Sequence, residues 1–62
     1  MENTDRFIKI DEVENMIGLS QSRVYAMVKG GDFPKPVKLG KASRWPLSAV
    51  RKWMAAQIEA AA

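Results

Sequence analysis

The chain has 62 residues, of which 47% are hydrophobic and 8% aromatic, so we expect one small globular domain with a core of limited size. It contains no cysteine and no histidine, which excludes disulfides, the usual zinc ligand sets and the side chain best suited to acid–base catalysis near neutral pH. The formal net charge is +3, and no stretch approaches the roughly 18 apolar residues of a membrane span.

The charges are unevenly distributed along the chain. Residues 1–19 carry two basic and five acidic side chains, a net charge of −3, whereas residues 20–62 carry eight basic and two acidic side chains, a net charge of +6. A basic region of this kind indicates an anionic partner. The alternative is a basic surface that serves only solubility.

The amino-terminal segment, residues 1–5, lacks the basic and apolar regions of a signal peptide, so the expected location is the cytoplasm. Residues 7–10 form a short β-branched and aromatic run, which predicts an edge strand or an extended lead-in. We expect one domain over residues 1–62, with its ordered core from about residue 6 to residue 58.

A first helix is predicted to begin at Asp11, the expected N-cap, with Glu14 completing a capping-box pair. Its apolar stripe is formed by Val13, Met16 and Ile17. Gly18 is expected to end it in the left-handed conformation. Capping accounts for the acids, and no catalytic group of matching chemistry accompanies them.

A second helix is predicted over residues 20–29, with Ser20 as N-cap. Only Leu19 separates it from Gly18, so the two short helices have the outline of a helix-turn-helix. The face predicted to pack on the first helix holds Val24, Met27 and Val28. The opposite face and its flanks hold Gln21, Ser22, Arg23, Tyr25, Ala26 and Lys29. This face suits close approach to a groove, but an ordinary solvated helix face fits equally well.

The second helix is expected to end at the pair Gly30 and Gly31. Beyond it, Pro34 and Pro36 predict a stiff, extended connector, in which Phe33 is expected to enter the core.

Residues 37–45 predict a β-hairpin that turns at residues 40–42. We expect Val37, Leu39 and Trp45 to point inward. The basic and hydroxyl side chains on its exposed edge would be Lys38, Lys41, Ser43 and Arg44. Such a hairpin beside a helix-turn-helix is typical of a wing that contacts phosphates or the minor groove, and the alternative is a structural cover for the core.

A last helix follows Pro46, with Ser48 as the expected N-cap and fraying expected at residues 60–62. One side is lined by Val50, Trp53, Met54 and Ile58. Trp45 and Trp53 are expected in the core rather than in ligand stacking. Arg51 and Lys52 lie near the start of this helix, where their positive charges interact unfavourably with the helix dipole. An anionic partner would offset this unfavourable interaction.

The chain resembles the AlpA family of prophage-linked transcriptional regulators over about residues 6–58. The resemblance is carried by Leu19, Ser20, Ser22, Val24, Tyr25, Val28, Gly31, the block Phe33 to Gly40, Trp45, Val50 and Trp53. It implies a mainly α fold with a small β-hairpin, a winged helix-turn-helix like those of MerR-like regulators and phage excisionases. Ala49 departs from the pattern, because related sequences commonly have an acid there.

By position, the resemblance implies DNA contacts from the second helix in the major groove and from the wing on the backbone or minor groove. The helix residues are Gln21, Ser22, Arg23, Tyr25 and Lys29, and the wing residues are Lys38, Lys41, Ser43 and Arg44. Secondary phosphate contacts are expected from Lys35, Arg51 and Lys52. Arg23 could pair with a guanine edge and Gln21 with an adenine edge.

The sequence therefore predicts a sequence-specific DNA-binding transcriptional regulator with double-stranded DNA as its partner. No catalytic residue, metal, cofactor, small-molecule ligand or membrane association is expected. Self-association, repeated sites or RNA polymerase would add to the modest affinity of one short domain.

Two alternatives remain. An excisionase-like recombination accessory protein would share the fold and bend its DNA site sharply. A protein-interaction adaptor would need an exposed apolar patch, for which few large apolar residues remain once the core is assigned.

Overall fold

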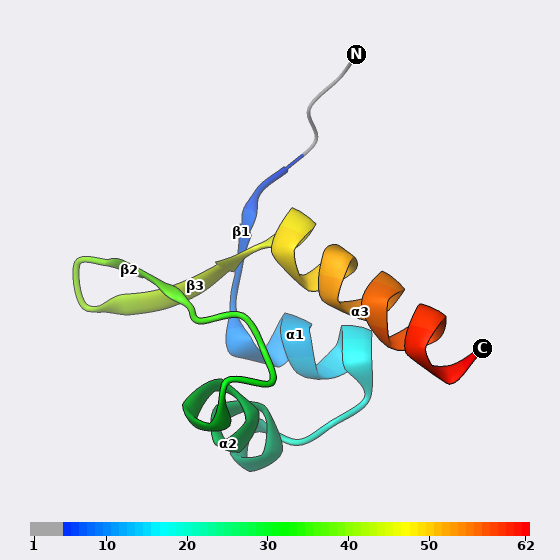
Figure 1. Ribbon diagram of the computed structural model, residues 1–62. Coiled ribbons are helices and arrows are strands. Elements are labelled where there is room, and N and C mark those ends of the chain that lie inside the picture. Colours follow the sequence, from blue (N-terminus) through cyan, green and yellow to red (C-terminus); the bar gives the residue numbers. More distant parts are fainter. Residues whose placement is uncertain (1–4) are drawn as a thin grey trace.

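The computed structural model describes residues 5–62; residues 1–4, which make up most of the segment predicted not to be a signal peptide, lie outside the described part. Three helices surround a small core, and a two-stranded hairpin projects away from them (Figure 1). This arrangement confirms the predicted winged helix-turn-helix. In chain order the elements are β1 (Phe7–Ile8), α1 (Ile10–Ile17), α2 (Gln21–Gly30), β2 (Val37–Leu39), β3 (Ala42–Pro46) and α3 (Leu47–Ala61).

The three strands form one antiparallel sheet in the order β1-β3-β2, which confirms the predicted edge strand and hairpin. In β1 and β3, Ile8 is opposite Trp45, and in β2 and β3, Lys38 is opposite Ser43. Gly40, with φ 66°, and Lys41 form the two-residue turn between β2 and β3. Glycine is favoured there because a side chain strains the left-handed backbone.

The start of α1 differs from the predicted one. Lys9 is the N-cap, and no side chain closes the cap. The strand runs directly into the helix, so Asp11 already lies in the first helical turn, and its carboxylate accepts the N–H of Glu12 at 3.1 Å. The predicted capping box of Asp11 with Glu14 is therefore wrong, although the negative charge of Asp11 still favours this end of the helix.

The tight connection into α2 is as predicted. Gly18 ends α1 with φ 71°, and its N–H donates to the carbonyl of Glu14. The Ser20 hydroxyl then accepts the N–H of Arg23 at 3.3 Å, and Gly31 ends α2 with φ 83°. Because α2 is closed by local caps at both ends, it is a rigid element.

The start of α3 corrects a second cap prediction. Ser48 is not the N-cap but lies inside the first turn, after Pro46 and Leu47. The Asp5 carboxylate accepts the Ser48 N–H at 2.8 Å and its hydroxyl at 2.7 Å. A side chain from the other end of the chain thus supplies the cap acceptor that the sequence pattern assigned to Ser48. The helix also continues to Ala61, past the expected fraying point.

The core lies where the helices meet the inner face of the sheet. Its buried side chains are Ile8, Val13, Val24, Phe33, Trp45, Leu47 and Val50. The Phe33 ring packs edge-on against Trp45 and Trp53, with centroid distances of 6.4 and 4.9 Å. The predicted core roles of these three aromatic residues are confirmed, although Trp53 is only partly buried.

Both indoles are also tied to the connector between α2 and β2. The Trp45 N–H donates to the Pro34 carbonyl at 2.8 Å, and the Trp53 N–H donates to the Asp32 carbonyl at 2.6 Å. These bonds fix the connector relative to β3 and α3, because a buried indole N–H needs a partner. Within residues 5–62, no helix is long and apolar enough to span a membrane.

Three hydrophobic side chains expected on inward faces are instead exposed: Val37 (40%), Leu39 (45%) and Ile58 (70%). In β2 the reason is register. Lys38 lies opposite Ser43, two residues before the buried Trp45, so Lys38 shares the inner face, and its neighbours Val37 and Leu39 take the outer one. Ile58 is exposed because α3 extends beyond the core.

Candidate nucleic-acid interface

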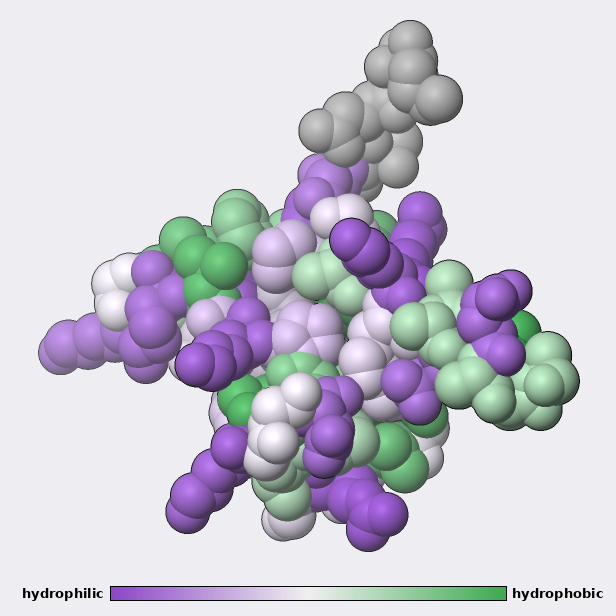
Figure 2. Space-filling model, viewed as in Figure 1, coloured by the Kyte–Doolittle hydropathy of each residue, from purple (hydrophilic) through white to green (hydrophobic). Residues whose placement is uncertain are grey.

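The outer side of α2 is a polar helix face that is open to solvent beside the hairpin. Gln21, Ser22, Arg23 and Lys29 are all exposed, while Val24 on the opposite side is completely buried. Figure 2 shows hydrophilic side chains projecting from the lower part of the molecule, where α2 lies, and from the tip of the hairpin. The structure therefore brings the predicted helix residues together on one accessible element.

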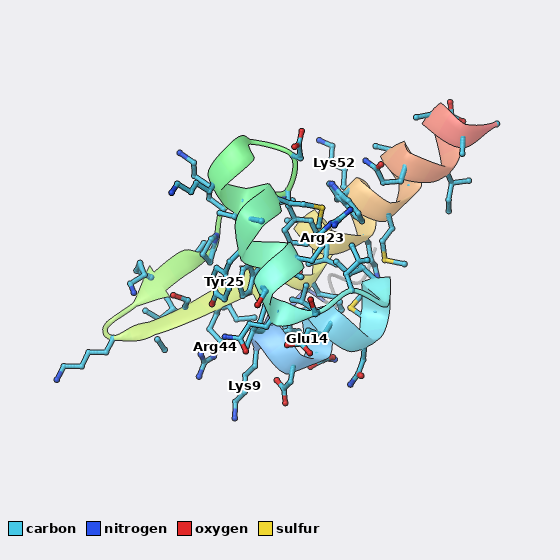
Figure 3. The ribbon with its side chains drawn as sticks, turned by 90° about the horizontal axis from the view of Figure 1, so that it is seen from below. Lys9, Glu14, Arg23, Tyr25, Arg44 and Lys52 are labelled. Atoms are coloured by element: carbon cyan, nitrogen blue, oxygen red, sulfur yellow. The ribbon has the colours of Figure 1, made fainter. Side chains whose placement is uncertain are left out.

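The residues of α2 divide between two flanks. Tyr25 points toward the hairpin, and its ring packs on Trp45 with a centroid distance of 5.9 Å (Figure 3). Arg23 points to the opposite side, toward α3, where it borders a groove with Trp53 and Gln57. Tyr25 therefore packs against the core on one side and is 38% exposed overall. The Arg23 guanidinium forms no ion pair within the described chain.

The predicted wing residues divide between the two faces of the hairpin. Lys38 and Ser43 share the inner face, and the Lys38 ammonium donates to the Ser43 hydroxyl at 3.4 Å. Arg44 lies on the outer face opposite Val37, and its guanidinium donates to the Ser43 carbonyl at 3.0 Å. Lys41 occupies the turn and is exposed. The four side chains therefore flank the hairpin rather than follow one edge, as the alternation of a strand requires.

The secondary phosphate candidates Lys35, Arg51 and Lys52 are all exposed. Lys35 lies in the connector, and the other two lie in the second turn of α3. In the structure as described, the only salt bridge joins Arg6 to Glu12. The basic side chains of α2, the hairpin and α3 therefore form no salt bridge there.

Hydrogen bonds shift two titratable groups in the amino-terminal region. The Ser48 hydroxyl and N–H hold the pKa of the Asp5 carboxyl below its usual value, with a smaller contribution from the charge of Arg51. The hydrogen bond to Glu12 raises the pKa of the Arg6 guanidinium. Both shifts favour the charged forms, so these groups serve internal contacts.

Residues 5–62 contain no cluster of acidic side chains that could hold a metal ion, and none of their polar side chains is buried. The arrangement offers exposed donors and positive charges, which suit recognition of an anionic surface.

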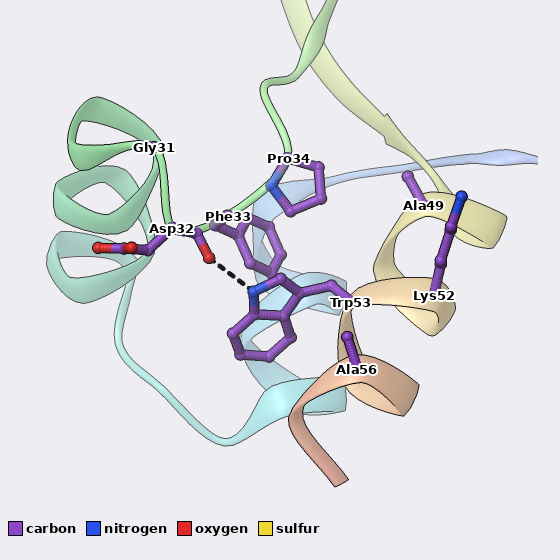
Figure 4. Close-up of a pocket in the computed structure, with 8 residues that line it drawn as sticks. All are labelled: Gly31, Asp32, Phe33, Pro34, Ala49, Lys52, Trp53 and Ala56. Atoms are coloured by element: carbon purple, nitrogen blue, oxygen red, sulfur yellow. Dashed lines mark hydrogen bonds between the residues drawn. The ribbon is translucent and has the colours of Figure 1, made fainter. Parts of the chain in front are cut away.

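Two surfaces were missed by reasoning from the sequence. One is a groove of about 460 Å³ between the connector and α3, where Phe33, Pro34 and Trp53 form apolar walls with Lys52 at the edge (Figure 4). The other is the outer sheet face, where Phe7 (51% exposed) joins Val37 and Leu39. The strand parity relative to Trp45 could have revealed the second surface. Large apolar residues are therefore more exposed than the sequence suggested.

Comparisons with known proteins identify a family and one similar phage protein. A family model described as prophage CP4-57 regulatory protein (AlpA) matches residues 6–58. The uncharacterized protein ORF88 of Enterobacteria phage P4 is 42% identical over 55 residues, which cover 87% of this chain and 62% of that protein. The chain thus spans less than two thirds of the length of this relative. No solved structure matches the chain.

Proposed function

The chain belongs to the AlpA family of prophage regulatory proteins, and from this we propose that it is a sequence-specific DNA-binding transcriptional regulator. In this proposal α2 enters the major groove, and the hairpin lies on the adjacent backbone or in the minor groove. The role places the protein in the cytoplasm, at the nucleoid. Double-stranded DNA is its principal partner.

The observation that supports the proposal best is the exposed outer face of α2. A helix about 10–12 Å in diameter fits the major groove, which is about 12 Å wide. The face presents side chains that can donate to bases or phosphates, Gln21, Ser22, Arg23 and Lys29, without a large apolar residue among them. Local caps at both ends hold α2 rigid, so these groups are preorganised for binding.

The two flanks of α2 have different roles in this proposal. Gln21 and Tyr25 lie on the hairpin side, where Gln21 can pair with an adenine edge and Tyr25 can reach a phosphate or a thymine methyl. Arg23 lies on the α3 side, where it can reach a guanine edge or the phosphates beyond it. Lys38, Lys41 and Arg44 contact the backbone beside the wing.

Binding of duplex DNA at several salt concentrations tests the proposal. Most of the affinity should come from counterions released by Lys and Arg, so the logarithm of the binding constant falls linearly with the logarithm of salt concentration. Lys41→Ala should weaken binding to all sequences alike and lower this slope by about one. Lys9→Ala, a lysine that is not among the proposed contacts, is the matched control and should lower the slope less than Lys41→Ala.

Absence of any DNA binding at low salt would contradict the proposal. If the protein binds, selection from random duplexes identifies the DNA sequence that it prefers. A palindrome or direct repeat in that sequence would indicate two bound copies. A sharp bend in a circular-permutation gel shift would favour the excisionase-like role over simple regulation.

A further inference from the structure

Helix α3 extends well beyond the core that supports its first half. Leu47 and Val50 are buried, and Trp53 and Met54 are partly buried, but all residues from 55 to 62 are exposed. Figures 1 and 3 both show this half projecting away from α1 and α2. Helices in proteins derive most of their stability from packing of an apolar face, and this half has none.

One stripe of the projecting half has the properties of a packing face. At 100° per residue, Arg51, Ala55, Ile58 and Ala62 follow one another at spacings of four, three and four residues, the spacing of a coiled-coil seam. We call these four residues the α3 seam. Ile58, at 70%, is the most exposed large hydrophobic side chain of the described residues. Lys52 and Glu59 border the same edge of the seam.

We propose that two copies of this chain associate through an antiparallel pairing of their α3 seams. The order of the charges determines the direction. With the helices antiparallel and the twofold axis beside Ala55, Glu59 of each copy lies opposite Lys52 of the other, giving two ion pairs. A parallel pairing would put this edge of the two copies on opposite sides of the seam, so neither ion pair would form.

Two further features fit a second copy as the occupant. Neither Lys52 nor Glu59 has an ion-pair partner within residues 5–62, so both charges are available. The small Ala55 side chain at the centre lets the two helix axes approach closely, so that Ile58 of each copy can pack on the facing helix.

The interface is small, so the association is weak. The stretch from Arg51 to Ala61 is about 16 Å long at 1.5 Å per residue, and it buries less than the roughly 800 Å² per partner of a standard interface. We expect a dissociation constant for the dimer on the order of 0.1 mM. On adjacent DNA sites, binding of one domain of the dimer would raise the effective concentration of the other, so the dimer would bind DNA more tightly than one domain alone.

Cysteine cross-linking without DNA tests the pairing independently of the proposed function. The natural chain has no cysteine, so a single introduced thiol reports one position. Ala55→Cys, beside the twofold axis, should give a disulfide-linked dimer under mild oxidation. Ala60→Cys, the matched control, replaces an exposed alanine on the opposite side of α3 and should stay mainly monomeric. Equal yields from the two variants would overturn the proposal.

Sedimentation equilibrium of the unmodified chain tests the energetics. Ile58→Ser and Glu59→Lys should each weaken the dimer about tenfold or more, and Lys52→Glu combined with Glu59→Lys should restore it, because the exchanged charges again face each other. Circular dichroism checks that α3 stays helical in each variant. A chain that remains monomeric near 1 mM, or a double variant no better than Glu59→Lys, would overturn the proposal.

Discussion

Charged residues have different surroundings in the two halves of this chain. In the region 5–19, Asp5 accepts two hydrogen bonds from Ser48, Arg6 pairs with Glu12, and Asp11 accepts a backbone N–H. In the region 20–62, the basic side chains make only two internal hydrogen bonds, from Lys38 and Arg44 on the hairpin, and no salt bridge within the described residues.

The difference separates charges that stabilise the fold from charges that are available to a partner. Both halves carry charged residues in the sequence. The two kinds of charge are distinguished only by whether each group forms hydrogen bonds or salt bridges within the chain. If the separation is correct, substitutions of the hydrogen-bonded charges in the first region should change stability, and substitutions of basic residues in the second should change DNA binding.

The largest expected effect compares two arginines. Arg23→Ala should lower the affinity for a cognate site by about 5- to 150-fold, the cost of one lost base contact, and should lower the affinity for random DNA less. Arg6→Ala should leave DNA affinity essentially unchanged, because Glu12 already engages that guanidinium. Fluorescence anisotropy with cognate and random duplexes measures both.

Equal losses on cognate and random DNA would reassign Arg23 from the bases to a phosphate on the α3 side. A large loss of DNA affinity for Arg6→Ala, with the melting temperature unchanged, would contradict the distinction between the two regions.

A smaller effect concerns thermal stability. Asp5→Asn and Ser48→Ala should each lower the melting temperature by a few degrees: Asp5→Asn replaces the carboxylate that accepts both hydrogen bonds, and Ser48→Ala removes the bond from the hydroxyl. Combining them should add little, since both act on one interaction. Glu14→Gln is the control: the Glu14 side chain takes no part in capping α1, and its carbonyl, which accepts the Gly18 N–H, is kept, so the melting temperature should stay the same. Thermal unfolding followed by circular dichroism measures all four proteins.

The smallest expected effect is a dependence of stability on pH in the acid range. The pKa of Asp5 is lower in the folded chain than the ordinary value of 3.8 for this side chain, so the unfolded chain binds the proton more readily. The stabilisation is therefore complete above about pH 4 and is lost as the pH falls through the lowered value. The difference in melting temperature between the natural chain and Asp5→Asn should shrink over this range. A difference that stays constant down to pH 2 would exclude the Asp5 carboxylate as the titrating group.

Features determined by a few neighbouring residues were predictable from the sequence. Gly18, Ser20 and Gly31 define the ends of α1 and α2 through local backbone geometry, and the structure has them where the pattern places them. The hairpin turn follows in the same way from Gly40. Each of these signals depends on conformational preferences that act within one or two turns.

Features determined by distant partners were not predictable. The bond between Asp5 and Ser48 spans 43 positions, and nothing near Ser48 indicates it. The exposure of Val37 and Leu39 depends on the register of β2 against β3, where a shift of one residue exchanges the faces. The candidate site was predicted as a set of residues, but its division between the flanks of α2 and the faces of the hairpin required the fold.

The two indole bonds to the connector limit how sequences of this kind can vary. Trp45 and Trp53 hold the carbonyls of Pro34 and Asp32, two positions apart. Inserting or deleting one residue between Asp32 and Pro34 would leave at least one indole without its acceptor. Substitutions on the exposed side of α2 touch neither bond. In the proposed function, new DNA targets can therefore arise by point mutation on α2, while the length of the connector has to be kept.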